Sequence, residues 1–256
     1  MIKEAIQFIT TTPALPYAKK RGYLFEAIAM ESRHRRCFSQ WQHHYQKCQQ
    51  AILKATEFCK QKRIIVIMGA GSLNDIPLST LSQQFEKVIL VDLIFLKQAR
   101  KKASTFSNVF LQEADVSNRL SALFEGNLTH DFSQEWRLPA ETDCVVSLNL
   151  VTQLPLIPVR WLMQHFGLDE TDADQLGKTM IQSHLNLLES VQSVRCLIAD
   201  RQISEYDASG ELVDQFDPAW DVPLPKVADD WEWQMIPLEE SKQHTAQINQ
   251  VGVSVW

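Results

Sequence analysis

The chain has 256 residues, of which 45% are hydrophobic, and its 31 acidic and 25 basic side chains give a net charge of −6. This length and apolar content suit one domain of ordinary size, or one domain with an extension. The negative charge disfavours broad binding to nucleic acid, and a membrane span is excluded because no run of about 18 apolar residues occurs. Five cysteines without a CxxC pair predict reduced thiols and no metal centre. With no targeting signal at the N-terminus, the chain is expected to be cytoplasmic.

Residues 1–60 are predicted to form an N-terminal helical extension. The first twenty residues look irregular, because three threonines and two prolines lie between positions 10 and 16. From about Leu24 to Lys60, apolar residues recur at three- and four-residue steps, which predicts one or two helices packed beside a sheet. Residues 61–256 are predicted to form the main domain.

A glycine turn follows the first predicted strand. Ile64–Met68 is an unbroken apolar run, typical of a strand buried on both faces in a parallel sheet. It leads into Gly69-Ala70-Gly71, which contains two of only 8 glycines. Asn74 or Asp75 is expected to cap the next helix, with Pro77 in its first turn.

The rest of the chain alternates strands and helices. A second strand, Val88–Val91, ends in Asp92, and residues 205–230, rich in Asp and Pro, predict a long irregular excursion. Two alternating segments near the C-terminus predict an antiparallel hairpin at the edge of the sheet. The other predicted elements are strands at 109–115, 144–148 and 195–199, a helix at 96–106, a helix and loop within 118–140, helices within 156–193 broken at Gly167 and Gly177, and the hairpin strands at 231–236 and 251–255.

Two features favour S-adenosylmethionine over a dinucleotide as the ligand of the glycine turn. The dinucleotide fingerprint GxGxxG requires a third glycine, and Asn74 stands in its place. Asp75 would repel a pyrophosphate at the start of the following helix, whereas a sulfonium cation tolerates a nearby acid. Polar residues also end the next strands, where ligands of such sheets bind. Asp92 can accept hydrogen bonds from ribose hydroxyls, Asp115 can accept from the adenine amino group, and Asn149 would lie at the reactive end of the cofactor.

At this point the chain resembles the class I S-adenosylmethionine-dependent methyltransferases. The matching segments are Ile67–Gly71, Val91-Asp92, Glu113–Asp115 and residues 143–155, within a resemblance that spans roughly residues 61–256. It implies an α/β fold with a Rossmann-like, seven-stranded, mostly parallel sheet that has one reversed strand in a C-terminal antiparallel hairpin. The family often has an acid where this chain has Ile67 and a third glycine where it has Leu73. The turn also resembles uncharacterised bacterial methyltransferase-like proteins.

The resemblance implies S-adenosyl-L-methionine as the cofactor and methyl transfer to an unidentified acceptor. A small molecule is slightly favoured over a protein side chain or RNA, and the oligomeric state is not predicted. The N-terminal helices and the 205–230 excursion are expected to frame the acceptor pocket. Asn149 and His184 are the candidate catalytic residues, and Arg33 is a candidate partner of the methionine carboxylate. The predicted cofactor-binding residues are Gly69, Ala70, Gly71, Asp75, Asp92, Leu93, Asp115, Val116, Asn149 and Arg33.

Two alternatives from other functional classes stay open. A non-catalytic Rossmann-fold binding or regulatory module would explain the altered glycine motif. A nicotinamide-dependent oxidoreductase is less favoured, because of the broken fingerprint and Asp75. Binding measurements with S-adenosylmethionine and its demethylated product discriminate the methyltransferase from the binding module, and nicotinamide bound to the purified protein would support the oxidoreductase.

Overall fold

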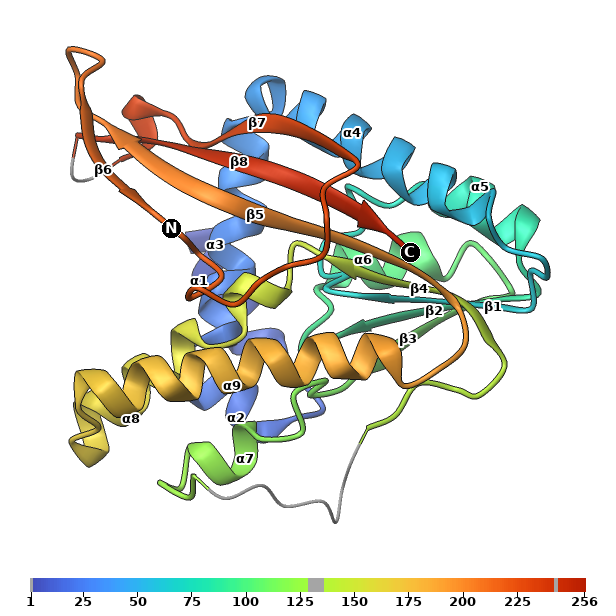
Figure 1. Ribbon diagram of the computed structural model, residues 1–256, viewed down its shortest axis with the longest axis horizontal. Helices are drawn as coiled ribbons and strands as arrows, with labels where there is room; N and C mark the ends of the chain where they lie inside the picture. Colours follow the sequence, from blue (N-terminus) through green and yellow to red (C-terminus); the bar gives the residue numbers. More distant parts are fainter. Residues whose placement is uncertain (1, 129–135, 242–243) are drawn as a thin grey trace.

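The computed structural model describes residues 2–128, 136–241 and 244–256 (Figure 1). None of the helices in these ranges has the length and apolar character needed to cross a membrane. The helices are α1 (Ile2–Thr10), α2 (Pro16–Lys20), α3 (Tyr23–Arg36), α4 (Phe38–Thr56), α5 (Leu78–Gln84), α6 (Lys97–Ala103), α7 (Leu120–Leu123), η2 (Val151–Gln153), α8 (Leu156–Phe166), α9 (Glu170–Glu189) and η3 (Leu238–Glu240). The strands are β1 (Ile64–Met68), β2 (Lys87–Asp92), β3 (Val109–Glu113), β4 (Thr142–Leu148), β5 (Val194–Tyr206), β6 (Leu212–Phe216), β7 (Asp229–Ile236) and β8 (Ala246–Val255).

The strands form one sheet in the order β3-β2-β1-β4-β5-β8-β7, and β6 pairs with β5 off this path. Pairing is parallel from β3 through β5 and antiparallel between β5 and β8 and between β8 and β7. Along the seven-stranded path, β8 alone therefore runs in the reverse direction. This order confirms the predicted Rossmann-like sheet with a C-terminal antiparallel hairpin.

Helices cover both faces of the sheet (Figure 1). Side chains alternate along β1, so that Ile65 and Ile67 pack with α4, α5 and α6, while Val66 and Met68 pack with α9. All four side chains are fully buried, as the uninterrupted apolar run of β1 predicts. α4 shares its core with the sheet, although it belongs to the predicted N-terminal extension.

Helices α2 and α3 lie over the loop that follows β2. Ala18, Leu24 and Ile28 are buried against Ile94 and Leu96 of that loop. Just before α2, the backbone N–H of Ala14 donates a hydrogen bond of 2.6 Å to Glu113 Oε2 at the end of β3. The N-terminal helices thus cover the carboxyl ends of β2 and β3, where the cofactor was predicted to bind.

Two local predictions near the N-terminal half are wrong. Residues 1–20 were expected to be irregular, but within the described residues they contain α1 and α2. The prolines separate these helices: Pro16 occupies the first turn of α2, where its missing N–H is not needed. The expected cap of α5 is also absent, because Pro77, and not Asn74 or Asp75, occupies the N-cap position without a side-chain hydrogen bond.

The other wrong predictions concern Gly177 and the 205–230 excursion. Helix α9 continues through Gly177, where an added Cβ would lie 2.2 Å from the ring of Trp220. That glycine makes room for an indole and does not end a helix. The excursion begins with the outer part of β5 and contains β6, whose residues are all exposed. Part of the predicted 118–140 loop, residues 129–135, lies outside the described residues.

Candidate functional site

The glycine turn after β1 is pressed against the end of β4. Gly69 has a φ of 80°, and a Cβ added there would lie 2.3 Å from the backbone oxygen of Leu148. The N–H groups of Gly69 and Ala70 donate to the carbonyl of Val91 at 3.0 and 3.2 Å. The turn therefore has no room for a side chain at Gly69, and it is joined to the end of β2.

Leu73 replaces the third glycine of the resembling family but keeps a glycine-like backbone. Its φ is 61°, in the left-handed region that costs a residue with a Cβ roughly 1–2 kcal/mol. The Leu73 side chain is fully buried, and its carbonyl accepts a hydrogen bond of 2.6 Å from Lys102 Nζ. Packing and this hydrogen bond therefore hold the loop on its path without glycine.

Asp92 closes the turn from the end of β2. Its Oδ2 accepts a hydrogen bond from Gly71 N–H at 2.8 Å, and its Oδ1 accepts one from Leu93 N–H at 2.7 Å. Burial raises the pKa of this carboxyl to about 6. Each carboxylate oxygen can accept two hydrogen bonds. Because Oδ2 has one partner among the described residues, it retains capacity for one ligand hydroxyl.

Asp115 follows β3 and holds its own loop. Oδ1 accepts from the N–H and Oγ of Ser117 at 2.9 and 2.6 Å, and Oδ2 accepts from the N–H groups of Arg119 and Leu120 at 3.1 and 2.8 Å. These four hydrogen bonds use the full capacity of the carboxylate, so none is left for an adenine amino group. The neighbouring Val116 is buried in the core on the α9 side.

Four side chains from distant parts of the chain meet beside the glycine turn: His44 and Cys48 of α4, Asp75 of the loop after β1, and Asn149 after β4. We call them the polar cluster. The nitrogen of the Asn149 amide lies 3.2 Å from His44 Nε2, 3.4 Å from Asp75 Oδ2 and 3.9 Å from Cys48 Sγ. Asn149 has a φ of 48°, and its amide oxygen is buried without a partner among the described residues.

His44 is enclosed by two tryptophans of β7. Its ring stacks on Trp233 with the centroids 3.8 Å apart, and the indole N–H of Trp231 donates a 3.1 Å hydrogen bond to His44 Nδ1. Burial lowers the pKa of His44 to about 3, so the ring is neutral near pH 7. An indole N–H only donates. Nδ1 must therefore be the acceptor, and the single proton of the neutral ring lies on Nε2.

This proton argues against a metal ion in the polar cluster. The ligand atoms of His44, Cys48 and Asp75 lie within 4.8 Å of one another, and His44 Nε2 is 3.5 Å from Cys48 Sγ. A histidine that binds a metal through Nε2 keeps its proton on Nδ1 and donates it. Trp231 imposes the opposite arrangement on His44, and burial also raises the pKa of the Cys48 thiol well above its ordinary value.

Three acids lie at the carboxyl edge of the sheet: Asp200, which is buried, and Asp75 and Asp92, which are half-buried. Burial raises the pKa of each to about 6. Lys102 acts on Asp75 from a distance, but none of the three forms an ion pair within the described ranges. The Oδ1 atom of Asp200 is also buried without a hydrogen-bond partner among the described residues. An unpaired buried carboxylate is unfavourable, so this edge of the sheet suits a cation.

Asp200→Asn is expected to stabilise the protein at pH 7.5 by about 1–3 kcal/mol, since one pKa unit corresponds to about 1.4 kcal/mol. The folded protein binds this proton more tightly than the unfolded chain does, because its pKa rises from 3.8 to about 6. The stability from protonation is therefore present below pH ~4 and lost as the pH rises through ~6. Urea unfolding at pH 4.5 and 7.5 measures the difference in free energy of unfolding between the variant and the unmodified protein.

The gain for Asp200→Asn should be small at the acidic pH, and an equal gain at both values would contradict the explanation. Asp207→Asn is the control. Hydrogen bonds from Ser209 lower the pKa of that exposed carboxyl, so its stabilising effect is present at neutral pH and lost on acidification. Its replacement should destabilise the protein at pH 7.5, with the opposite sign.

Two predicted site residues lie apart from the polar cluster. His184 is buried beneath the sheet in α9, with Nε2 2.8 Å from Ser147 Oγ, and burial lowers its pKa to about 4. Arg33, in the last turn of α3, has a buried Nε without a partner in the described part of the chain, and its Nη1 faces Met30 Sδ at 3.9 Å. Among the described residues, neither of them forms a hydrogen bond with Asn149.

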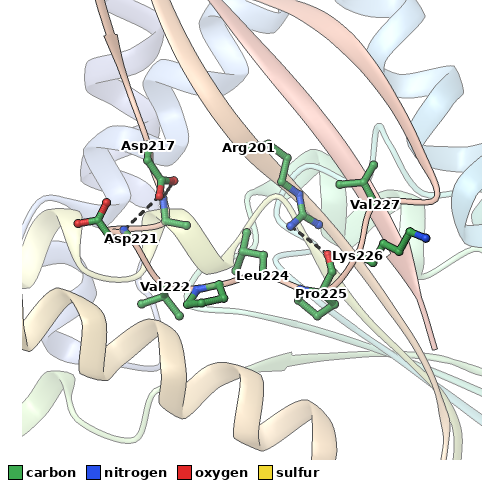
Figure 2. Close-up of a pocket in the computed structure, with 10 residues that line it drawn as sticks. Arg201, Asp217, Asp221, Val222, Leu224, Pro225, Lys226 and Val227 are labelled. Carbon is green, nitrogen blue, oxygen red and sulfur yellow. Dashed lines mark hydrogen bonds between the residues drawn. The ribbon is translucent and has the colours of Figure 1, made fainter.

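Two hollows lie on the surface beside the loop 217–227. Figure 2 shows the first, of about 400 Å³, in which Arg201 reaches toward Pro225 and Asp217 toward Asp221. The second, of about 450 Å³, runs along α9 and shares Asp221, Val222 and Pro223 with the first. Neither is lined by the glycine turn or by the polar cluster.

Sequence reasoning brought Asp75, Asp92 and Asn149 to this edge but missed His44 and Trp231. A signal for His44 was present: it lies three residues after Trp41 and four before Cys48, within the apolar stripe of its helix. A polar residue at such a position is either paired or functional. Trp231 gave no comparable signal, because it contacts His44 across 187 residues of sequence.

Comparisons with known proteins give similarity in structure alone. No protein-family model and no curated protein matches the sequence. Among solved structures, the N-methyltransferase NodS from Bradyrhizobium japonicum, crystallised with S-adenosylhomocysteine, is 10% identical with a TM-score of 0.42, over 82% of this chain and 86% of that one. The 1,6-didemethyltoxoflavin-N1-methyltransferase of Burkholderia thailandensis is 9% identical with a TM-score of 0.45, over 95% and 92%. The sheet of this chain, mostly parallel with one reversed strand, is the one that its resemblance to class I S-adenosylmethionine-dependent methyltransferases implied.

Proposed function

We propose that the protein binds S-adenosylmethionine at the carboxyl edge of the sheet and transfers its methyl group to an acceptor. The observation that carries this proposal is the set of three buried or half-buried acids that have raised pKa values and no ion pair among the described residues, Asp75, Asp92 and Asp200. A sulfonium and an ammonium group supply positive charge where these carboxylates lack it. The phosphates of a nicotinamide dinucleotide would add negative charge at the same place, which disfavours the oxidoreductase alternative.

We assign different parts of the proposed cofactor to different residues near the turn. The free capacity of Asp92 Oδ2 suits a ribose hydroxyl. Gly71 N–H, from the turn Gly69–Gly71, donates to that oxygen, and Leu93 N–H donates to Oδ1. Arg33 stays a candidate for the methionine carboxylate, because its buried Nε lacks a partner in the described residues. We propose a loop-holding role for Asp115, whose hydrogen-bonding capacity is used, and leave His184 out of the site. Val116 contributes apolar surface.

Asp75 and Asn149 are the polar groups proposed to lie at the methyl end. Methyl transfer from a sulfonium is an in-line displacement of an activated group, so positioning the acceptor is the main requirement. We favour a small-molecule acceptor, because α2 and α3 cover this edge of the sheet and the net charge of −6 disfavours RNA. We also propose that the protein is cytoplasmic.

We expect isothermal titration calorimetry to show binding of S-adenosylmethionine and S-adenosylhomocysteine, and none of NAD⁺. Only the first ligand carries the sulfonium charge, and the three acids ionise as the pH rises through about 6. The ratio of the two affinities should therefore shift toward S-adenosylmethionine between pH 5 and pH 8. A protein that binds neither compound is not this enzyme.

A second candidate is a non-catalytic Rossmann-fold module. The hollows at the loop 217–227, away from the glycine turn, favour it, as does Ile67 in place of the family's usual acid. The same titration separates the two, because the module predicts no heat with either adenosyl compound.

A further inference from the structure

The proton on His44 Nε2 decides which way the amide of Asn149 faces. The two ends of an amide have the same shape, so their partners determine which end is nitrogen. With nitrogen toward His44, two N–H donors would face each other at 3.2 Å, and the amide oxygen would stay buried without a partner. With oxygen toward His44, the ring N–H donates to it. The second orientation satisfies the ring.

Asp75 fits the same orientation. Its Oδ2 lies 3.4 Å from the amide atom that faces His44, and an amide oxygen has two lone pairs. His44 N–H takes one of them, and below a pH of about 6 Asp75 is a carboxylic acid that can donate to the other. Burial raises the pKa of Asp75 to about 6, and Asp92 raises it as well, while Asn149 and Lys102 lower it. The chain Trp231–His44–Asn149–Asp75 then leaves no donor facing another donor.

We propose that Trp231 and His44 are positioning residues that turn the NH₂ group of Asn149 into the ligand site, where it donates to an oxygen of the bound molecule. The identity of that molecule rests on the proposed function. Two sources offer such an oxygen, namely the carboxylate of the cofactor's methionine part and the acceptor. The NH₂ group therefore favours ligands that place an oxygen at this position, because a buried NH₂ that stays unpaired is unfavourable.

The tautomer of His44 tests the positioning directly. In ¹⁵N-labelled protein, we expect NMR to show the proton on Nε2 and a bare Nδ1. Trp231→Phe removes the indole N–H and keeps an aromatic ring, so the proton should move partly or wholly to Nδ1. Trp233→Phe is the matched control: Trp233 stacks on the same imidazole, but its Nε1 is buried without a partner among the described residues. That variant should keep the tautomer. A wild-type ring protonated on Nδ1, or the same response in both variants, overturns the proposal.

Two adenosyl ligands then identify the source of the oxygen. S-adenosylhomocysteine carries the amino-acid carboxylate, and 5′-methylthioadenosine lacks it. If the carboxylate is the partner, Trp231→Phe weakens the first ligand by about fivefold to tenfold and leaves the second unchanged. Unchanged affinity for both, with the tautomer shifted, assigns the oxygen to the acceptor.

Equal losses for both ligands in both variants mark a structural effect and contradict positioning. If neither ligand binds the unmodified protein, the proposed function fails. The NMR measurement still decides the positioning of Asn149 in that case.

Discussion

Gly69→Ala is expected to lower the free energy of unfolding by about 2–5 kcal/mol, the sum of backbone strain and overpacking. Gly69 has a φ of 80°, and the new Cβ would lie 2.3 Å from Leu148 O and 3.0 Å from Leu150 Cβ. The obstacle is backbone at the end of β4, which cannot rotate away as a side chain can. The turn and the strand would have to separate. Urea unfolding at pH 7 measures the loss.

Gly210→Ala is the control for that result. Gly210 has a φ of 86°, and an added Cβ meets nothing within 4 Å. It therefore carries the strain without the collision, and its loss should be about 1 kcal/mol. Equal losses in the two variants would mean that the close approach of the turn to β4 contributes nothing.

Asp92→Ala is expected to weaken S-adenosylmethionine binding at least about tenfold, because a hydrogen bond to a carboxylate contributes on the order of 1.5–3 kcal/mol. The substitution removes the acceptor proposed for the ribose and also releases Gly71 N–H and Leu93 N–H. Calorimetric titration gives the affinity, and thermal unfolding reports any loss of stability. Unchanged affinity would remove Asp92 from the site.

Asp115→Ala provides the matched comparison. Asp115 also holds a loop through backbone N–H groups, and its four hydrogen bonds leave no capacity for a ligand. We expect a lower melting temperature and an affinity within about twofold of the unmodified protein. A large loss of affinity would return Asp115 to its predicted role beside the adenine.

The sheet was predictable because its strands are buried on both faces. Ile64–Met68 and Val88–Val91 are apolar runs that end at a glycine turn and an acid, and both strands lie where the sequence places them. A fully apolar run shows no periodicity, so its short length, five residues in β1, and the glycine turn that follows it are what favour a strand over a helix. The C-terminal hairpin followed from strict alternation, which is typical of a strand with one exposed face.

Elements without a burial pattern were harder to predict. All residues of β6 are exposed, so its sequence shows no alternation of buried and exposed side chains. β6 is a strand because it pairs with the outer part of β5. The role of Gly177 depended on Trp220, which lies beyond the next two strands, β5 and β6. The spacing of residues around Gly177 carries no information about a side chain that is so distant in the sequence.

The polar cluster shows the same limit at the candidate site. Asp75 and Asn149 could be placed near each other because both follow parallel strands, whose carboxyl ends share one edge. Their contact with His44 depends on how α4 lies across the sheet, and the proton of His44 depends on an indole of β7. Whether Asp115 points at a ligand or at its own loop is likewise decided by backbone geometry, which residue type does not specify.

Leu73 has a consequence for tracing relatives of this chain. Glycine there would relax the left-handed backbone by roughly 1–2 kcal/mol, but it would also delete a fully buried leucine, a loss of about 2–5 kcal/mol for a change as large as Leu→Ala. No single exchange at this position brings back the GxGxG pattern without a net penalty. A search keyed to that pattern would therefore pass over proteins that share this leucine, while one keyed to the backbone path of the turn would retain them.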